Sequence, residues 1–292
     1  MLAVGLVLGL PAAARADDAP FIEWTSLLQG LATTYEPTSE NDCTAGRPQC
    51  VDAVIREMQR RFDPLASACD HKAIFALSYL RTTEEFKRTI QDPAFFEDTR
   101  FVTHEDAVFG RYFFEAADDW QAGRRAEVPG AWAVAMDAAD RREMPASGDL
   151  SLGINAHVQR DLPFVLAGIG LVKPDGTSRK HDHDRVNMFL NRVTDGLIAE
   201  IAARFDPTAD DRDLPGSIDD TGIFQIIPTW REIAWRNAER LVTAPDRLTR
   251  AAVAADIERY AASQAEILRR AQGYVPLVQN STARDAYCAT HH

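Results

Sequence analysis

Hydrophobic positions recur along most of the chain with the period of an α-helix. In the stretch 151–171 the positions that share one face, at about 100° per residue, include Ile154, His157, Asp161 and Val165. The same spacing predicts further helices at Phe21–Tyr35, Val51–Phe62, His71–Ile90, Thr103–Gln121, Lys180–Phe205, Thr229–Leu241 and Leu248–Gln272. No hairpin dipeptide joins two alternating runs. We therefore predict an all-α fold, a single multi-helix bundle with a central buried helix pair.

Breaks in this pattern divide the chain without splitting it into separate folds. Proline and glycine accumulate in the acidic stretch Asp206–Asp220, which predicts a surface loop that could act as a lid. Ile223–Ile227 is short enough to be a strand or an extended piece. We expect one helical domain over 17–292, with cysteine-bearing helices in 17–92, a core in 93–245 and a C-terminal helix and tail in 246–292.

The first residues indicate export. An apolar run ends at the small-residue site Ala14-Arg15-Ala16, which predicts a signal peptide over residues 1–16, although the usual basic start is missing. The four cysteines fit an oxidising compartment, so we expect a secreted or periplasmic protein. Of the three possible pairings we favour Cys43–Cys50 with Cys69–Cys288, the second of which would hold the C-terminal tail to the body.

Charge limits the partners of the protein. The formal net charge is -12, and no basic stripe offsets it, which argues against a nucleic-acid partner. No segment after the first residues is apolar enough for a stable membrane span. A small-molecule substrate or ligand is the partner that this composition favours.

Two helical stretches carry side chains that could bind a metal. His157 and Asp161 lie one turn apart on a face with apolar neighbours, and His183 and Asn187 repeat that spacing in the second stretch. A mixed nitrogen and oxygen ligand set suits zinc, manganese or iron. An equally good alternative is a structural cluster, in which Asp161 caps a helix that restarts before Pro163 and the histidines are hydrogen-bonded core residues.

Asp184 and Arg111 could serve the predicted metal site. Asp184 would orient a ligand or act as a general base, and Arg111 would hold an anionic group of the substrate, unless it pairs with Glu115. Serine nucleophile elbows, phosphate loops and the zincin motif are missing from the sequence. Hydrolysis by a metal-bound water is the reaction that this residue set favours.

Four segments resemble an uncharacterised bacterial all-helical family, a domain of unknown function. They are Asn155-Ala156-His157 through Asp161-Leu162-Pro163, Asp184-Arg185-Val186-Asn187, Val108-Phe109-Gly110-Arg111-Tyr112 and Arg231-Glu232-Ile233-Ala234-Trp235. The resemblance spans about 95 to 241 and implies a helical fold with a shared polar centre, but it brings no established reaction. We therefore predict an exported metal-dependent enzyme, a hydrolase. The alternative is a non-catalytic exported protein that binds an apolar or amphipathic small molecule.

Overall fold

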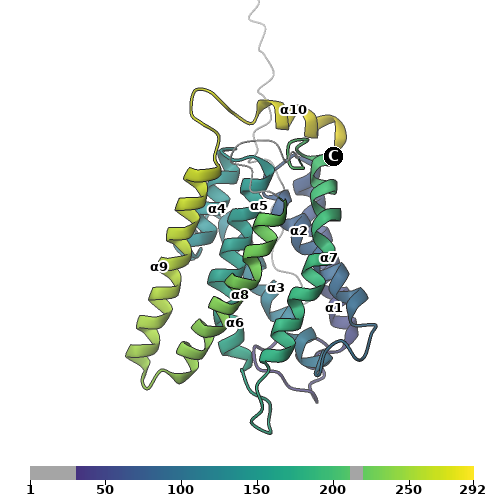
Figure 1. The fold of residues 1–292 in the computed structure, drawn as a ribbon, viewed down its shortest axis with the longest axis vertical. Coiled ribbons are helices and arrows are strands. Elements are labelled where there is room, and N and C mark those ends of the chain that lie inside the picture. The colour runs from purple at the N-terminus through teal and green to yellow at the C-terminus, as the bar shows by residue number, and fades with distance from the viewer. Residues whose placement is uncertain (1–30, 211–219) are drawn as a thin grey trace, which may run out of the picture.

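The computed structural model describes residues 31–210 and 220–292, and these residues form a helical bundle (Figure 1). In chain order the helices are α1 (Pro48–Ser67), α2 (Ala73–Thr89), α3 (Thr99–Gln121), α4 (Gly130–Asp140), α5 (Ala146–Asn155), the π-helix η3 (Ala156–Asp161), α6 (Leu162–Ile169), α7 (Lys180–Arg204), α8 (Asp220–Thr243), α9 (Arg247–Gln272) and α10 (Thr282–His291). The described residues contain no strand and only one isolated bridge, between Val172 and Ser178. The predicted all-α fold is confirmed.

Polar caps and glycines set the limits of several helices. The carboxylate of Asp98 accepts from the backbone N–H of Phe101 at the start of α3, and Asp246 does the same for Thr249 at the start of α9, at 3.1 and 2.7 Å. Gly123, at φ +75°, follows the end of α3, where glycine carries no steric cost. These helix ends therefore follow from local sequence.

The centre of the bundle is formed by α5, η3 and the first half of α2. Every residue from Gly148 to Asn155 is buried, and so is every residue from Ala73 to Leu80. α5 packs against α2, α4 and α9, and η3 packs against α3, α4, α8 and α9. α7, the second predicted polar stretch, packs mainly against α2 and α8. The buried partner of the α5–η3 run is thus α2.

Two disulfides link cysteines of the described residues, one within a short loop and one between distant segments. Cys43 pairs with Cys50 and Cys69 pairs with Cys288, as predicted. The second bond holds α10 across one end of the long helices (Figure 1). The predicted C-terminal tail thus includes a helix, α10.

Four sequence predictions need correction or fall at least partly outside the described residues. Ile223–Ile227 is neither a strand nor extended, because it lies within α8. Residues 31–35 of the predicted helix Phe21–Tyr35 are not helical, and the rest of that helix lies outside the described residues, as does the predicted signal peptide at 1–16. Most of the predicted loop Asp206–Asp220, residues 211–219, also lies outside them.

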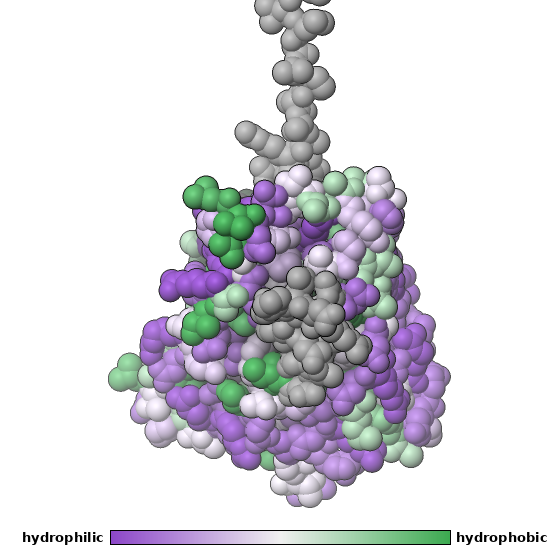
Figure 2. Space-filling model, turned by 45° about the horizontal axis from the view of Figure 1, so that its top comes forward, coloured by the Kyte–Doolittle hydropathy of each residue, from purple (hydrophilic) through white to green (hydrophobic). Residues whose placement is uncertain are grey.

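The face drawn in Figure 2 is mostly hydrophilic, and its apolar residues occur in separate groups. None of the helices in the described ranges has the length and apolar character needed to cross a bilayer. The two disulfides together with this finding are compatible with a location outside the cytoplasm.

Candidate functional site

The helix through the middle of the bundle widens where His157 and Asp161 lie. Residues Ala156–Asp161 form a π-helix between α5 and α6. Pro163 lies two residues after Asp161, and a proline has no N–H to donate to the preceding turn, which favours an irregular hydrogen-bond pattern there. Such π segments insert one extra residue into a helix and are frequent at functional sites. The local sequence thus accounts for the irregular backbone that carries this pair.

His157 and Asp161 form a buried pair within that π-helix. Nδ1 of His157 donates to Oδ2 of Asp161 at 3.1 Å, and the two residues are 4% and 0% exposed. This bond places the proton on Nδ1 and leaves the lone pair on Nε2. Burial lowers the pKa of His157, although Asp161 opposes the shift, so the imidazole is neutral at pH 7.

Asp161 is held in place by two further donors. Trp132 Nε1 donates to its Oδ2 at 2.8 Å and Arg160 Nη1 donates to its Oδ1 at 3.0 Å. Arg160 also pairs with Glu258 on α9 at 2.7 Å. The side chain of Asp161 does not cap α6, because its oxygens are taken up by these groups. The carboxylate therefore orients His157 and does not cap the start of α6.

Aromatic rings surround the imidazole. The ring of His157 stacks on Phe109 with centroids 3.5 Å apart and planes 6° apart. Tyr79 approaches it from another side, with a centroid distance of 4.5 Å and an angle of 60°. These contacts exclude water from the faces of the imidazole and fix its plane.

His157 lies on the wall of a cavity of about 110 Å³, here called the His157 cavity. Its wall includes Phe75, Tyr79, Glu105, Asp106, His157 and Arg231. They come from α2, α3, η3 and α8. Among the described residues, Nε2 of His157 has no hydrogen-bond partner although it is buried. The remaining lining is largely apolar, so the cavity combines a few polar groups with hydrophobic walls.

Two adjacent carboxyl groups on α3 have unusual proton affinity. Burial raises the pKa of Glu105 to about 7 and the pKa of Asp106 to about 8. The nearby Glu105 charge raises the pKa of Asp106 further. Oδ2 of Asp106 is buried and finds no hydrogen-bond partner in the described part of the chain. Asp106 is therefore a protonated acid at neutral pH.

Arg231 supplies the positive charge at the cavity. It is 4% exposed, and its Nη2 donates to the backbone O of His183 at 2.8 Å. Its Nε has no partner within the described ranges. Burial lowers the pKa of Arg231 to about 10, while Glu105 opposes that shift, so the guanidinium stays charged at neutral pH. An anionic or carbonyl oxygen in the cavity would satisfy its free N–H.

The four residues of the predicted metal site do not form one cluster. His157 and Asp161 are hydrogen-bonded, but His183 instead bonds Arg231 through Nε2 to its backbone O at 3.2 Å and packs on Trp235. In residues 31–210 and 220–292, no group of three metal-ligating side chains with ligand atoms within 4.8 Å includes His157 and His183. Oδ1 of Asn187 is buried and has no hydrogen-bond partner there. Metal binding by this set stays a prediction.

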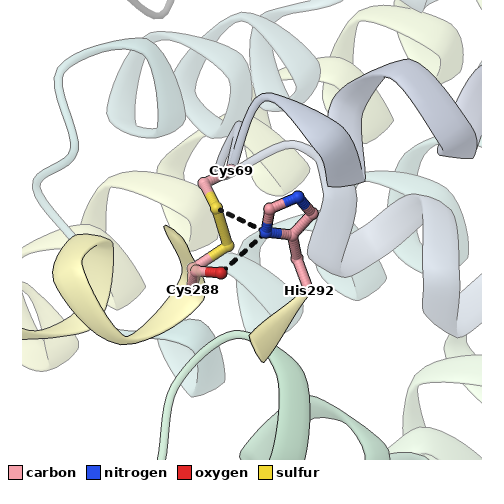
Figure 3. Close-up of side chains that lie close together, drawn as sticks. All are labelled: Cys69, Cys288 and His292. Carbon is pink, nitrogen blue, oxygen red and sulfur yellow. Dashed lines mark hydrogen bonds between the residues drawn. A yellow bond between two sulfur atoms is a disulfide. The ribbon is translucent and has the colours of Figure 1, made fainter. Parts of the chain in front are cut away.

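Two other groups of ligand-type side chains lie elsewhere. One is Cys69, Cys288 and His292, but both sulfurs belong to a disulfide and are not thiolates, as Figure 3 shows. The other is Glu97, His181 and Asp182, near the start of α3. The oxygens of Asp182 accept from the backbone N–H of Glu97 and of Asp98 at 2.8 and 2.9 Å, so this carboxylate already has a structural role.

The predicted catalytic residues lie away from the His157 cavity. Asp184 is exposed and pairs with Lys180. Arg111 donates to the backbone O of Leu31 at 3.0 Å and to Oγ1 of Thr33 at 2.6 Å, and its Nε lies 3.7 Å from Glu115. Neither Asp184 nor Arg111 lines the cavity. Arg111 anchors the segment before α1, and its predicted role in substrate binding has no geometric support.

Glu105 and Asp106 are not among the site residues that the sequence predicts. A helix that starts at Thr103 has both of them in its first turn, where acidic residues are favourable. The helix starts four residues earlier, at Thr99, so both residues lie inside it and line the His157 cavity. The available signal was the cap at Asp98, which the sequence places just before Thr99.

Comparison with curated proteins and with solved structures gives no significant match. Residues 51–271 match DUF5995, a family of unknown function. This match extends beyond the range of about 95 to 241 expected from the motifs and includes most of α1. Because this match covers most of the 292 residues, the chain belongs to the DUF5995 family.

Proposed function

We propose that the protein is an exported hydrolase that acts on a small amphipathic molecule held in the His157 cavity. The observation that carries the proposal is a set of three buried polar atoms without hydrogen-bond partners among the described residues: Nε2 of His157, Oδ2 of Asp106 and Nε of Arg231. All three side chains line the same cavity. A buried polar atom without a partner costs about 1–3 kcal/mol, so a ligand that pairs with all three gains that energy back.

The three groups suit general acid–base catalysis. Nε2 of neutral His157 takes a proton from a water molecule, and the resulting hydroxide attacks a carbonyl carbon of the substrate. The N–H of Arg231 donates to the carbonyl oxygen as negative charge develops on it. Protonated Asp106 gives its proton to the leaving oxygen, and the proton on His157 later returns that carboxyl to its acid form. Asp161 stabilises the imidazolium that forms between these steps.

A metal-dependent version of the reaction would need several metal-ligating side chains close together at the cavity. A catalytic zinc ion needs about three protein ligands with one position left open. The described residues place no such group of three at this cavity. We therefore assign no step to a metal ion, and the chelation arm below tests the prediction of zinc, manganese or iron.

Hydrolysis of methyl esters, with acyl chains from acetate to hexanoate and with the released acid followed at constant pH, tests the proposal. We expect His157→Gln, which keeps the bulk of the side chain, to lose about 100-fold or more of kcat/KM. His181→Gln is the matched control because His181 is exposed and outside the cavity. Full activity in His157→Gln would contradict the proposal. Loss of activity on chelation, restored by zinc or manganese, would support the metal version.

The alternative is a protein that binds such a molecule without converting it. The apolar part of the lining favours it, because Phe86, Phe109 and Phe189 all face the cavity. Saturable binding of an ester without turnover would support this alternative. Export is tested separately, by locating the full chain after fractionation of the producing cells.

A further inference from the structure

A second cavity lies next to the His157 cavity. It measures about 90 Å³ and is here called the Trp132 cavity, after one of its lining residues. Its walls come from α1, α2, α3, α4 and α5. Of the described residues, Phe75 is the single side chain that lines both cavities. Phe75 therefore stands between them.

Phe75 belongs to an aromatic cluster at the boundary of the two cavities. It packs edge-to-face against Phe113 and Trp132, with centroids 5.0 and 5.1 Å away, and both of these line the Trp132 cavity. It also meets His157 at 5.6 Å and Tyr79 at 6.1 Å, and both of these line the His157 cavity. Trp132 and His157 lie 6.0 Å apart, so the rings form one continuous cluster, and Phe75 is its buried member that lines both cavities.

The Trp132 cavity suits an apolar chain better than a second polar ligand. The charged side chains on its wall are ion-paired with each other or with residues outside it. Arg61 donates to Asp118 at 2.6 Å, and Arg284 donates to Asp149 at 2.6 Å. Trp120, Trp132 and Met136 supply much of the remaining surface. A tail that crossed the position of Phe75 would enter a hydrophobic space.

We propose that Phe75 is the residue that sets the length of the apolar tail of the ligand. This inference rests on the proposed function, because it takes the polar head to lie at His157 and Arg231. A cavity of about 110 Å³ is smaller than the cavity of about 150 Å³ that holds a benzene molecule, so it admits only a short chain. A smaller residue at position 75 joins the two cavities and admits a longer chain.

Straight-chain alcohols from 1-propanol to 1-octanol are suitable probes. A hydroxyl group can both donate to an imidazole nitrogen and accept from a guanidinium N–H, the two kinds of polar group that His157 and Arg231 bring to the cavity wall. Alcohols are not hydrolysed, so their binding does not depend on catalysis. Each methylene that becomes buried should raise the affinity about fourfold. Binding is measured by titration calorimetry on the folded full chain.

In the unmodified protein we expect the affinity to stop rising by 1-hexanol. In Phe75→Ala it should keep rising by about fourfold per methylene up to 1-octanol. Phe75→Leu is the milder variant, since loss of a buried phenylalanine can unfold a protein, and it should extend the rise in the same direction. Phe113→Leu is the matched control, because Phe113 lines only the Trp132 cavity and its substitution leaves Phe75 in place.

The proposal is overturned if the affinity of the unmodified protein rises without a plateau. It is also overturned if the folded Phe75 variants share the plateau of the Phe113→Leu control, or bind no alcohol saturably. An affinity that keeps rising to longer alcohols in the Phe75 variants, together with full ester hydrolysis in His157→Gln, would refute the proposed catalytic role alone. The two failures are therefore distinguishable.

Discussion

His157 lies face to face with Phe109, with ring centroids 3.5 Å apart and planes 6° apart. The ring of Phe109 offers no hydrogen bond to an imidazolium, and the second nitrogen of His157 has no partner among the described residues. Only Asp161 favours the charged form of the ring, and burial outweighs it in lowering the pKa of His157. Burial thus keeps His157 in the neutral form that a general base requires.

The first prediction concerns the protonation of His157. Its pKa in the folded protein should lie below 6.5, and the same holds for His183, whose pKa burial lowers still further. As the pH falls below 6.5, the unfolded chain binds protons that the folded protein resists, so stability should fall. Titration of the imidazole C–H signals by NMR, assigned with His157→Gln, checks this. A titration of His157 at or above 6.5 would contradict it.

Asp106→Asn should change stability in the opposite pH range. Because the pKa of Asp106 is raised to about 8, the unfolded chain loses that proton near pH 4 while the folded protein retains it. The stability contributed by the protonated acid is therefore present at low pH and is lost as the pH rises toward 8. The asparagine variant cannot ionise, so it should exceed the unmodified protein in stability by more than about 1 kcal/mol at pH 9.

Urea unfolding of both proteins at pH 5 and pH 9 measures that difference. Asp195→Asn is the control, because Asp195 is an exposed carboxylate on α7. Equal pH profiles for Asp106→Asn and the unmodified protein would show that Asp106 is ionised in the folded state.

The two disulfides should contribute unequally to stability. Cys69–Cys288 closes a separation of 219 residues and Cys43–Cys50 one of 7. In the chain-entropy model these loops correspond to about 5 and about 2 kcal/mol of unfolding free energy. Separate double Cys→Ser variants of each pair, unfolded in urea, give the comparison. A larger loss from the short loop would indicate that the contacts of α10, and not loop closure, hold the C-terminal end.

The all-α class and the burial of the 151–171 stretch could be predicted because each depends on local pattern, whereas the favoured Cys69–Cys288 pair joins residues 219 apart and was one choice among three possible pairings. Helical period and residue type indicate which face is buried. The site itself depends on which helices become neighbours. His183 and His157 are the same residue type, each with an oxygen-bearing side chain four residues on. Only the structure shows that His183 hydrogen-bonds to the backbone O of Arg231. It also shows that Glu105, Asp106 and Phe75 line the same cavity as His157.

Arg231 illustrates the same limit. The sequence places it only in a family-like helical segment, and its hydrogen bond to the backbone O of His183 is structural. Its free Nε becomes meaningful only because α8 packs against η3 and α7, which brings the guanidinium to the cavity. Contacts of this kind join segments more than 40 residues apart, and no periodicity encodes them.

Gly153→Ala gives the sharpest test of the packing around Phe75. A Cβ at position 153 would lie 2.8 Å from Cβ of Phe75 and closer to its ring atoms, so the ring would have to move. Overpacking of this kind costs about 1–3 kcal/mol, while alanine gains about 1 kcal/mol over glycine within a helix. We expect a net loss of up to about 2 kcal/mol in the free energy of unfolding.

Gly196→Ala is the matched control, because none of the described residues lies within 4 Å of a Cβ placed there on α7. It should stabilise the protein by up to about 1 kcal/mol. In a Phe75→Ala background the penalty of Gly153→Ala should shrink, since the two nearest ring atoms, Cδ2 and Cγ of Phe75, are gone. A double-mutant cycle measured by urea unfolding should give a coupling of about 1 kcal/mol or more. Strict additivity would mean that the methyl group at position 153 does not press on the ring of Phe75.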